Sequence, residues 1–239
     1  MNSSIQIIPP LNLALAFIPV ALVLIVMFKW SLQAGNAIYA IIRMLIQLLL
    51  VGYILTTIFA AEQAWIVVAV MLVMVTAASW IALGTVKRKR KQLFGYAFWA
   101  IASGGCLTLI LVTQGVINLE PWYEPRYMIP LAGMTFANSM ISVSLAAERL
   151  QAELSRDIEF GQARNEAFRA AFIPTINSML AVGLVSLPGM MTGQILSGVS
   201  PIVAAHYQIV VMCMIFGSAG LSTAYFLWLS RKVFEQGST

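Results

Sequence analysis

The sequence predicts an all-α membrane protein with about seven transmembrane helices. Of its 239 residues, 60% are hydrophobic and only 10% are charged. Apolar runs of about 18 or more residues recur along the chain, and a helix of that length can cross the hydrocarbon core of a bilayer. Backbone groups in that core must be satisfied within the segment itself, which favours helices. We therefore expect a multi-pass protein with one transmembrane domain over residues 1–239.

The expected spans follow one another between polar and charged loops. The first has no basic residue before it and Lys29 directly after it, the reverse of a secretory signal, so we expect it to be retained. The basic run 87–91 separates the third span from the fourth, and the charged loop 148–171 separates the fifth from the sixth. The seven apolar segments are about 11–28, 38–60, 64–85, 93–113, 128–147, 172–197 and 203–230.

The charges around the spans predict their orientation. With the N-terminus outside, the outer loops carry Glu62, Glu120 and Glu124. Twelve of the fourteen basic residues then fall in inside loops: Lys29, Lys87, Arg88, Lys89, Arg90, Lys91, Arg149, Arg156, Arg164, Arg169, Arg231 and Lys232. Cytoplasmic loops of membrane proteins are enriched in Lys and Arg, so we expect a cytoplasmic C-terminus. Because orientation explains the net charge of +5, the sequence does not predict binding to nucleic acid.

The sixth segment contains a break signal, within the run GLVSLPGMMTG from residue 183 to 193. Pro188 removes a backbone donor and Gly189 adds flexibility, and lipid cannot satisfy the groups that a broken helix exposes. Ser186, Gly189, Gly193 and Ser197 recur at spacings of three and four, which predicts a face of small residues that another helix can approach closely. The segment is either a kinked packing helix or a moving part, with Pro188, Gly189 and Gly193 as the gating residues.

Polar side chains inside the spans are the candidates for a substrate path. Asn138 lies in the fifth segment and Asn177 near the start of the sixth, and their default role is hydrogen bonding between helices. The alternative is that they line a path together with Ser186 and Met190. No Asp or Glu lies within a span, which argues against a proton relay of carboxylates. Flexible packing explains most of the thirteen methionines, so no metal ligand is assigned.

The inside loop 148–171 differs in composition from the rest of the chain. Leu150, Leu154 and Ile158 repeat at a spacing of four between charged residues, which predicts an amphipathic helix. Gly161 then predicts a turn before a second helix. Two helices around a glycine resemble the coupling loop of ABC importers, in which Leu154, Ile158 and Gly161 would contact an ATPase. A helix lying in the membrane interface would show the same periodicity.

The sequence has no motif of a known enzyme class. It lacks a Gly-x-Ser-x-Gly elbow, a His-Glu-x-x-His pair and a Cys-x-x-Cys pair. It has no Gly-Lys pair either, so this chain cannot form a phosphate-binding P-loop and binds no cofactor of its own. If ATP drives the protein, another polypeptide must bind it.

Several motifs together resemble the iron-export ABC transporter permease family, which includes plant half-transporters linked to aluminium tolerance. The resemblance covers nearly the whole chain, and the run from Gly183 to Gly193 is its most specific part. The other matching motifs are Arg43-x-x-x-Gln47 with Val51-Gly52-Tyr53, Ile129-Pro130 with Asn138-Ser139-Met140, Ile173-Pro174-Thr175-Ile176-Asn177-Ser178, and Tyr207-Gln208-Ile209.

The resemblance implies a permease subunit of the bacterial inner membrane that works as a homodimer with a separate ATP-binding subunit. That partner would hold ATP-Mg, and the cargo would be iron or another metal. The chain departs from the family in one place, because Glu153 to Ala171 is a shortened version of a longer inside loop. A stand-alone channel or secondary transporter, and a membrane scaffold that transports nothing, are the alternatives. The residues themselves leave the substrate and the direction of transport open.

Overall fold

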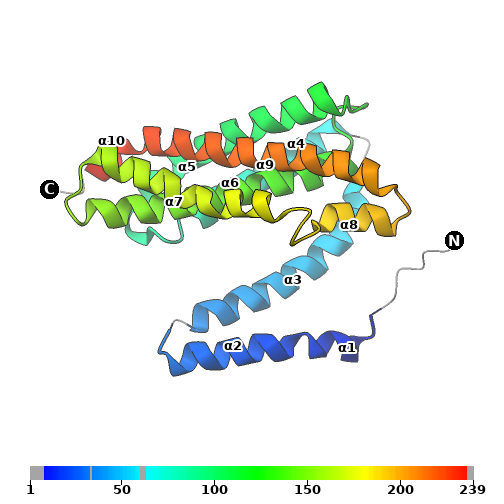
Figure 1. The fold of residues 1–239 in the computed structure, drawn as a ribbon, viewed down its shortest axis with the longest axis horizontal. Helices are drawn as coiled ribbons and strands as arrows, with labels where there is room; N and C mark the ends of the chain where they lie inside the picture. The colour runs from blue at the N-terminus through cyan, green and yellow to red at the C-terminus, as the bar shows by residue number, and fades with distance from the viewer. Residues whose placement is uncertain (1–7, 33, 60–62, 236–239) are drawn as a thin grey trace. The chain divides into compact units, whose positions relative to one another are not determined.

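The computed structural model describes residues 8–32, 34–59 and 63–235, and it is helical throughout apart from turns. Within those ranges the one β-type contact is an isolated bridge between Val182 and Ser186. The chain divides into two compact units, Met1–Ala61 and Glu62–Thr239 (Figure 1). The prediction of an all-α protein is therefore confirmed.

The first unit contains the first two expected spans. Its helices are α1 (Pro10–Leu15), α2 (Phe17–Lys29) and α3 (Ala34–Phe59). The first span is split at Ala16, because Pro19 has no N–H to donate to the carbonyl of Leu15 and so belongs to the first turn of a new helix. The helix α3 runs unbroken over 26 residues.

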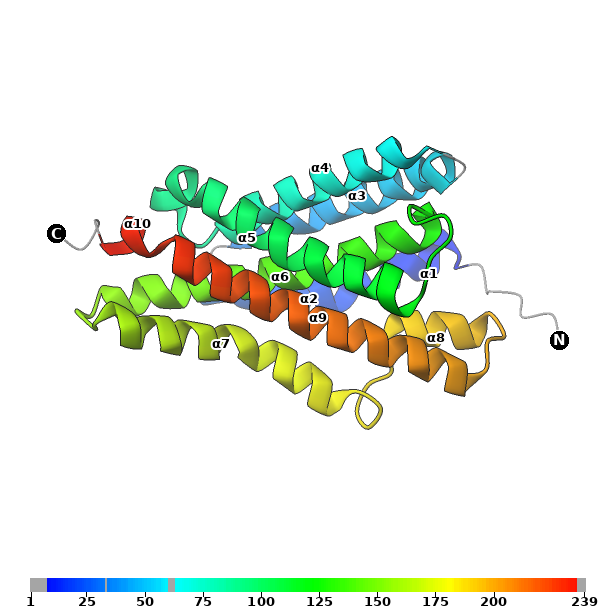
Figure 2. The same ribbon diagram turned by 90° about the horizontal axis from the view of Figure 1, so that it is seen from above.

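The second unit is a helical bundle built around α9. The helix α9 packs against α5, α6, α7 and α8, and α4 packs against α5 and α6 (Figures 1 and 2). The elements are α4 (Ala64–Ala82), the 3-10 turn η1 (Lys87–Lys89), α5 (Arg90–Ile110), the π-helical turn η2 (Leu111–Val116), α6 (Pro125–Leu154), α7 (Phe160–Ala181), α8 (Gly189–Leu196), α9 (Pro201–Leu229) and α10 (Arg231–Glu235).

Six of the seven expected spans form helices that are long and apolar enough to cross a membrane. Within the described residues these are Leu11–Lys29, Ala34–Thr56, Ala64–Ala82, Lys87–Val116, Pro125–Leu154 and Pro201–Leu229. The expected sixth segment, 172–197, is the exception, because α7 ends at Ala181 and α8 begins only at Gly189. In both views α7 and α8 follow one another along α9, which runs in the opposite direction (Figures 1 and 2). The expected sixth segment is therefore two separate helices, and its crossing of the membrane stays a prediction.

The predicted inside loops of the second unit lie at one end of the bundle. The ammonium group of Lys89 donates to the carbonyl of Val233 at 3.3 Å and lies 4.9 Å from the ring centre of Phe234. The guanidinium of Arg231 lies 5.3 Å from the ring centre of Phe160. These contacts join the turn after α4, the start of α7 and α10, as the predicted topology requires. The outside N-terminus and the cytoplasmic C-terminus stay predictions.

Glycine and serine allow α5, α6 and α9 to pack closely. A Cβ atom added at Gly104 would lie 2.5 Å from the hydroxyl of Ser222 and 2.7 Å from its backbone nitrogen. The same Ser222 hydroxyl is 3.2 Å from the hydroxyl of Ser139, which links α9 to α6. At Gly105 the added atom would meet the ring of Phe136 at 2.7 Å. Small residues at this junction are therefore required by the packing.

We expect Gly104→Ala to destabilise the bundle, because the new methyl group meets backbone atoms that cannot move aside alone. Overpacking of this kind costs about 1–3 kcal/mol. Gly95→Ala is the matched control on the same helix, since nothing lies within 4 Å of its added Cβ and alanine favours helix. Thermal unfolding in detergent should show a lower midpoint for Gly104→Ala only. An equal midpoint for both variants would contradict the close approach.

Candidate functional site

The helix break between α7 and α8 is a turn, and not the kink that Pro188 and Gly189 predict. The helix α7 ends at Ala181, and Val182 takes an extended conformation. Gly183 then adopts a φ of +83°, in the left-handed region that favours glycine. Pro188 is the residue that precedes α8, with Gly189 as the first helical residue.

Hydrogen bonds within the turn satisfy several of the backbone N–H groups at the break. The carbonyl of Ala181 accepts from the N–H groups of Leu184, Val185 and Ser186, at 3.3, 2.8 and 3.2 Å. The N–H of Gly183 donates to the carbonyl of Ser186 at 3.0 Å. Irregular backbone at membrane depth is tolerated where protein or water supplies such partners. These bonds give the turn a defined local structure.

A pocket of about 320 Å³ lies at the break, which we call the break pocket. Its wall comes from the end of α7, the turn, α8 and α9, and it is almost wholly apolar. Gln208 of α9 is the amide side chain in that wall; the residue is only 6% exposed. Its Oε1 atom is buried and has no hydrogen-bond partner in the described part of the chain. An acceptor in this state is a feature that calls for an explanation.

The predicted path residues do not meet in one cavity of this chain. Asn138 is half-buried, and its amide donates to the carbonyl of Met134 in its own helix at 2.8 Å. Asn177 and Ser186 are exposed. Met190 lies outside the break pocket, whereas its neighbour Met191 lines it. The roles of these residues as path residues remain predictions.

The predicted gating residues lie at the break, but the close helix approach predicted there is absent. Pro188 lines the break pocket. Gly189 and Gly193 are exposed, and no heavy atom of the described chain lies within 4 Å of a Cβ added at either. The small face of α8 is therefore open in this chain, since the tight contacts are made by α5 and α9 instead.

The predicted coupling loop is a short turn between two long helices. The helix α6 runs unbroken to Leu154, so that the predicted separate amphipathic helix is the last part of α6. The turn occupies 155–159, and Gly161 lies in the first turn of α7 and not between helices as predicted. Asp157 takes a φ of +58° and makes the reversal that was expected of Gly161.

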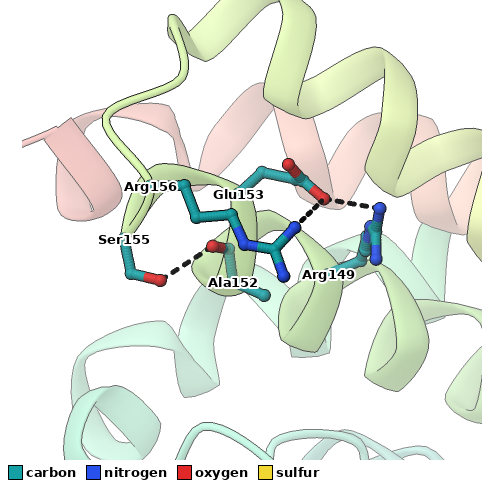
Figure 3. Close-up of polar contacts among 5 residues, drawn as sticks. All are labelled: Arg149, Ala152, Glu153, Ser155 and Arg156. Carbon is teal, nitrogen blue, oxygen red and sulfur yellow. Dashed lines mark hydrogen bonds and ion pairs between the residues drawn. The ribbon is translucent and has the colours of Figure 1, made fainter.

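A buried carboxylate lies at the end of α6, beside this α6–α7 turn (Figure 3). Glu153 is only 3% exposed, and its Oε1 atom lies 2.6 Å from Nη2 of Arg149. The second arginine, Arg156, is at 3.9 Å. The Ser155 hydroxyl donates to the carbonyl of Ala152 at 2.7 Å and closes the end of α6. Leu154, Ile158 and Gly161, the predicted coupling residues, are half-buried at or beside this turn.

The described residues contain no group of three or more His, Cys, Asp or Glu side chains that could hold a metal ion. The sequence interpretation missed Gln208, Met179 and Met212 as residues of a pocket. One signal was present, because Gln208 and Met212 are four residues apart on one face of α9. Only the fold shows that this face meets the break.

A family model described as "Uncharacterised protein family (UPF0014)" matches residues 10–234. The chain belongs to this family. A UPF0014 membrane protein of Synechocystis is 38% identical over 218 residues, which cover 84% of each chain. The "Probable iron export permease protein FetB" of Escherichia coli is 34% identical over 240 residues, which cover 93% of this chain and 91% of FetB. No solved structure matches.

The chain is also similar to a plant protein, ALUMINUM SENSITIVE 3 of Arabidopsis thaliana. It is 32% identical over 237 residues, which cover 91% of this chain and 85% of that protein. The family predicted from the motifs is thus confirmed, and this UPF0014 protein is a multi-pass membrane protein. The break pocket and the α6–α7 turn both lie within the residues that the family model matches.

Proposed function

We propose that this chain is the membrane-spanning permease subunit of an ABC transporter that exports a metal. The observation that carries the proposal is the break between α7 and α8, which borders a pocket in a chain similar to FetB over nearly its whole length. Broken helices of membrane transporters often border substrate sites, because the backbone groups freed at the break can bind a ligand in a cavity. The name of FetB supports iron as the cargo and export as the direction.

Transport is driven by ATP hydrolysis in a separate ATP-binding subunit. The sequence has no P-loop, so this chain is no ATPase and ATP-Mg binds to the partner. The α6–α7 turn is the docking element, since it lies at the basic end of the bundle. The enrichment of Lys and Arg in cytoplasmic loops assigns that end to the cytoplasm. The ion pairs of Glu153 give this turn a defined shape that a partner can recognise. The complex resides in the cell inner membrane.

The permease works as two copies. The face of α8 that carries Gly189 and Gly193 is open in one chain, and small residues let helices of different subunits approach closely. A substrate path between two copies would also explain why Asn138, Asn177, Ser186 and Met190 do not converge within one chain.

The experiment that tests the proposal has two parts. The tagged protein is first extracted gently from its native membrane, and the proteins that co-purify in equal amount are identified by mass spectrometry. The purified complex is then placed in vesicles, and ATP-dependent movement of iron is measured. An ATPase in equal amount together with ATP-dependent flux supports the proposal. Flux without any partner would indicate a channel or secondary transporter, and a partner without flux would indicate a scaffold; either result overturns the proposal.

We expect Gly193→Leu to weaken the association of two copies without destabilising one copy. The added side chain meets open space within the chain, so thermal unfolding should be unchanged. In a dimer whose helices meet at α8, the larger side chain would separate the two copies. Gly95→Leu is the matched control, because it also faces open space on another helix. Light scattering of both variants in detergent checks this. Unaltered dimers for Gly193→Leu would remove α8 from the interface.

A further inference from the structure

We infer that a cavity between α7 and α9, at the basic end of the bundle, binds the phosphate headgroup of an anionic phospholipid. The inference goes beyond the proposed function, because neither the permease role nor the name of a relative assigns a lipid site to this chain. It takes from the fold only that the chain is a multi-pass membrane protein.

The cavity, which we call the α7–α9 pocket, has a volume of about 430 Å³. The start of α7 and the end of α9 lie side by side at the end of the bundle that carries α10 (Figures 1 and 2). The lining residues are Arg164, Asn165 and Phe168 of α7 and Ala224, Leu227 and Trp228 of α9. The helix α7 thus supplies a charged side chain and α9 a largely apolar surface, a combination that suits an amphiphilic ligand.

Arg164 brings to this pocket a positive charge that no carboxylate balances. Its Nη2 and Nε atoms donate to Oδ1 of Asn165 at 3.0 and 3.2 Å. That contact occupies the amide oxygen, so the Asn165 NH2 group and the remaining guanidinium N–H groups can donate to a ligand. The wall contains no Asp or Glu, and Arg164 forms no ion pair with the described part of the chain. A set of donors with a net positive charge favours a phosphate.

Other basic side chains at this end of the bundle already have close partners within the protein. Arg149 lies 2.6 Å from the carboxylate of Glu153. The guanidinium of Arg90 donates to the carbonyl of Trp80 at 2.6 Å and lies 3.9 Å from the centre of its ring. Arg164 instead combines an unbalanced charge with an adjoining cavity.

The position of the α7–α9 pocket along its helices places it at the depth of lipid headgroups. Trp228 is 69% exposed and stacks on Tyr225, with ring centres 5.8 Å apart, and exposed Trp and Tyr near the end of a span are typical of the membrane interface. Arg164 lies four residues after the start of α7 and Ala224 five residues before the end of α9. Both are therefore about 6–8 Å inside the helix ends.

This depth favours a lipid over a soluble protein as the occupant. Ala224 and Trp228 are exposed side chains within the candidate span Pro201–Leu229, where lipid surrounds the protein. A soluble partner that approaches along the bundle meets the α6–α7 turn at 155–159 first. The pocket therefore belongs to the side of the bundle and not to its end.

The chemistry of the wall selects the class of lipid. A free phosphate ion gains nothing from Phe168 or the exposed face of α9, whereas the glycerol and acyl chains of a lipid bury that apolar surface. A zwitterionic lipid carries an ammonium group, which the unbalanced charge of Arg164 repels. Basic pockets between transmembrane helices bind anionic headgroups. An anionic phospholipid is therefore the ligand that fits both parts of the wall.

Native mass spectrometry of the full-length protein tests the site. The protein in detergent, stripped of lipid, is titrated with dioleoylphosphatidylglycerol and, separately, with dioleoylphosphatidylcholine, which has the same acyl chains. We expect tighter binding of the anionic lipid. Arg164→Gln should weaken that binding about tenfold, as expected when charge-assisted contacts are lost. Arg169→Gln is the matched control, because Arg169 is exposed on α7 and does not line the pocket.

A second variant, Ala224→Phe, tests the cavity apart from the charge. Ala224 is exposed and lines the pocket, so a larger side chain fills the cavity while Arg164 is retained, and binding of the anionic lipid should again weaken. Leu221→Phe is its control, at an exposed position of α9 outside the pocket. Thermal unfolding in detergent identifies a variant that fails to fold, and the other variant then tests the site alone.

Four results would overturn the inference. They are equal affinity for the two lipids, parental affinity in both Arg164→Gln and Ala224→Phe, an equal loss in Arg169→Gln, and displacement of the lipid by an equal concentration of inorganic phosphate, which would indicate a site for a free anion. If Arg164→Gln keeps parental lipid binding but loses the ATPase in a pull-down, the pocket is a protein docking surface instead. Because the titration needs no ATPase and no flux, its failure leaves the permease proposal untouched.

Discussion

Replacing Glu153 with glutamine is expected to abolish binding of the ATPase and ATP-driven flux while the protein still inserts in the membrane. The carboxylate of Glu153 is buried at the end of α6 and lies 2.6 Å from Arg149. Glutamine keeps the size but removes the charge, so that Arg149 and Arg156 lose the carboxylate with which they form ion pairs at the end of α6. The turn would then lose the defined shape that a docking partner needs.

The measurement is a pull-down of the ATPase with each variant, followed by flux in vesicles. Glu148→Gln is the matched control, because Glu148 is an exposed residue of α6 and the variant makes the same change in charge. Wild-type binding by Glu153→Gln would place the docking surface elsewhere. Gly161→Pro, the change that a loop glycine would suggest, is a poor test, because proline is tolerated in the first turn of a helix such as α7.

The spans could be predicted because they depend on one local property. An apolar run of sufficient length forms a helix in lipid whatever its neighbours are, and six of the seven expected spans are therefore present as helices. The ends of helices were harder to predict. Gly161 was expected to make the turn after α6, but Asp157 makes it with a φ of +58°. Nothing in the sequence distinguishes Asp157 from an ordinary acidic residue.

The contacts between helices could not be predicted from spacing. Small residues are paired in both helices, at Gly189 and Gly193 in α8 and at Gly104 and Gly105 in α5. Only the second pair is packed tightly in this chain, because only those glycines face another helix of the bundle. For the same reason Gln208 was assigned to a family motif and not to a pocket. Its place in the pocket wall follows from the position of the break beside α9, which depends on the packing of the whole bundle.

The second large effect is expected at Gly183, where valine should strongly reduce flux without preventing folding. The φ of +83° at this position is strongly unfavourable for a β-branched residue, so the turn must change its conformation. That change would break the bond from the Gly183 N–H to the carbonyl of Ser186 and reshape the wall of the break pocket. If the break serves transport, ATP-driven flux should fall about tenfold or more, as expected when a geometry essential to the site is lost.

Gly198→Val separates backbone strain from function. Gly198 has a φ of +91°, nothing lies within 4 Å of an added Cβ, and the residue does not line the break pocket. Valine at either position therefore carries a similar strain, of about 1–2 kcal/mol, and should lower the unfolding midpoint by a similar amount. Only Gly183→Val should strongly reduce flux. If both variants lose flux equally, the effect is general destabilisation; if both retain it, the turn between α7 and α8 is a packing feature, and the break has no part in transport.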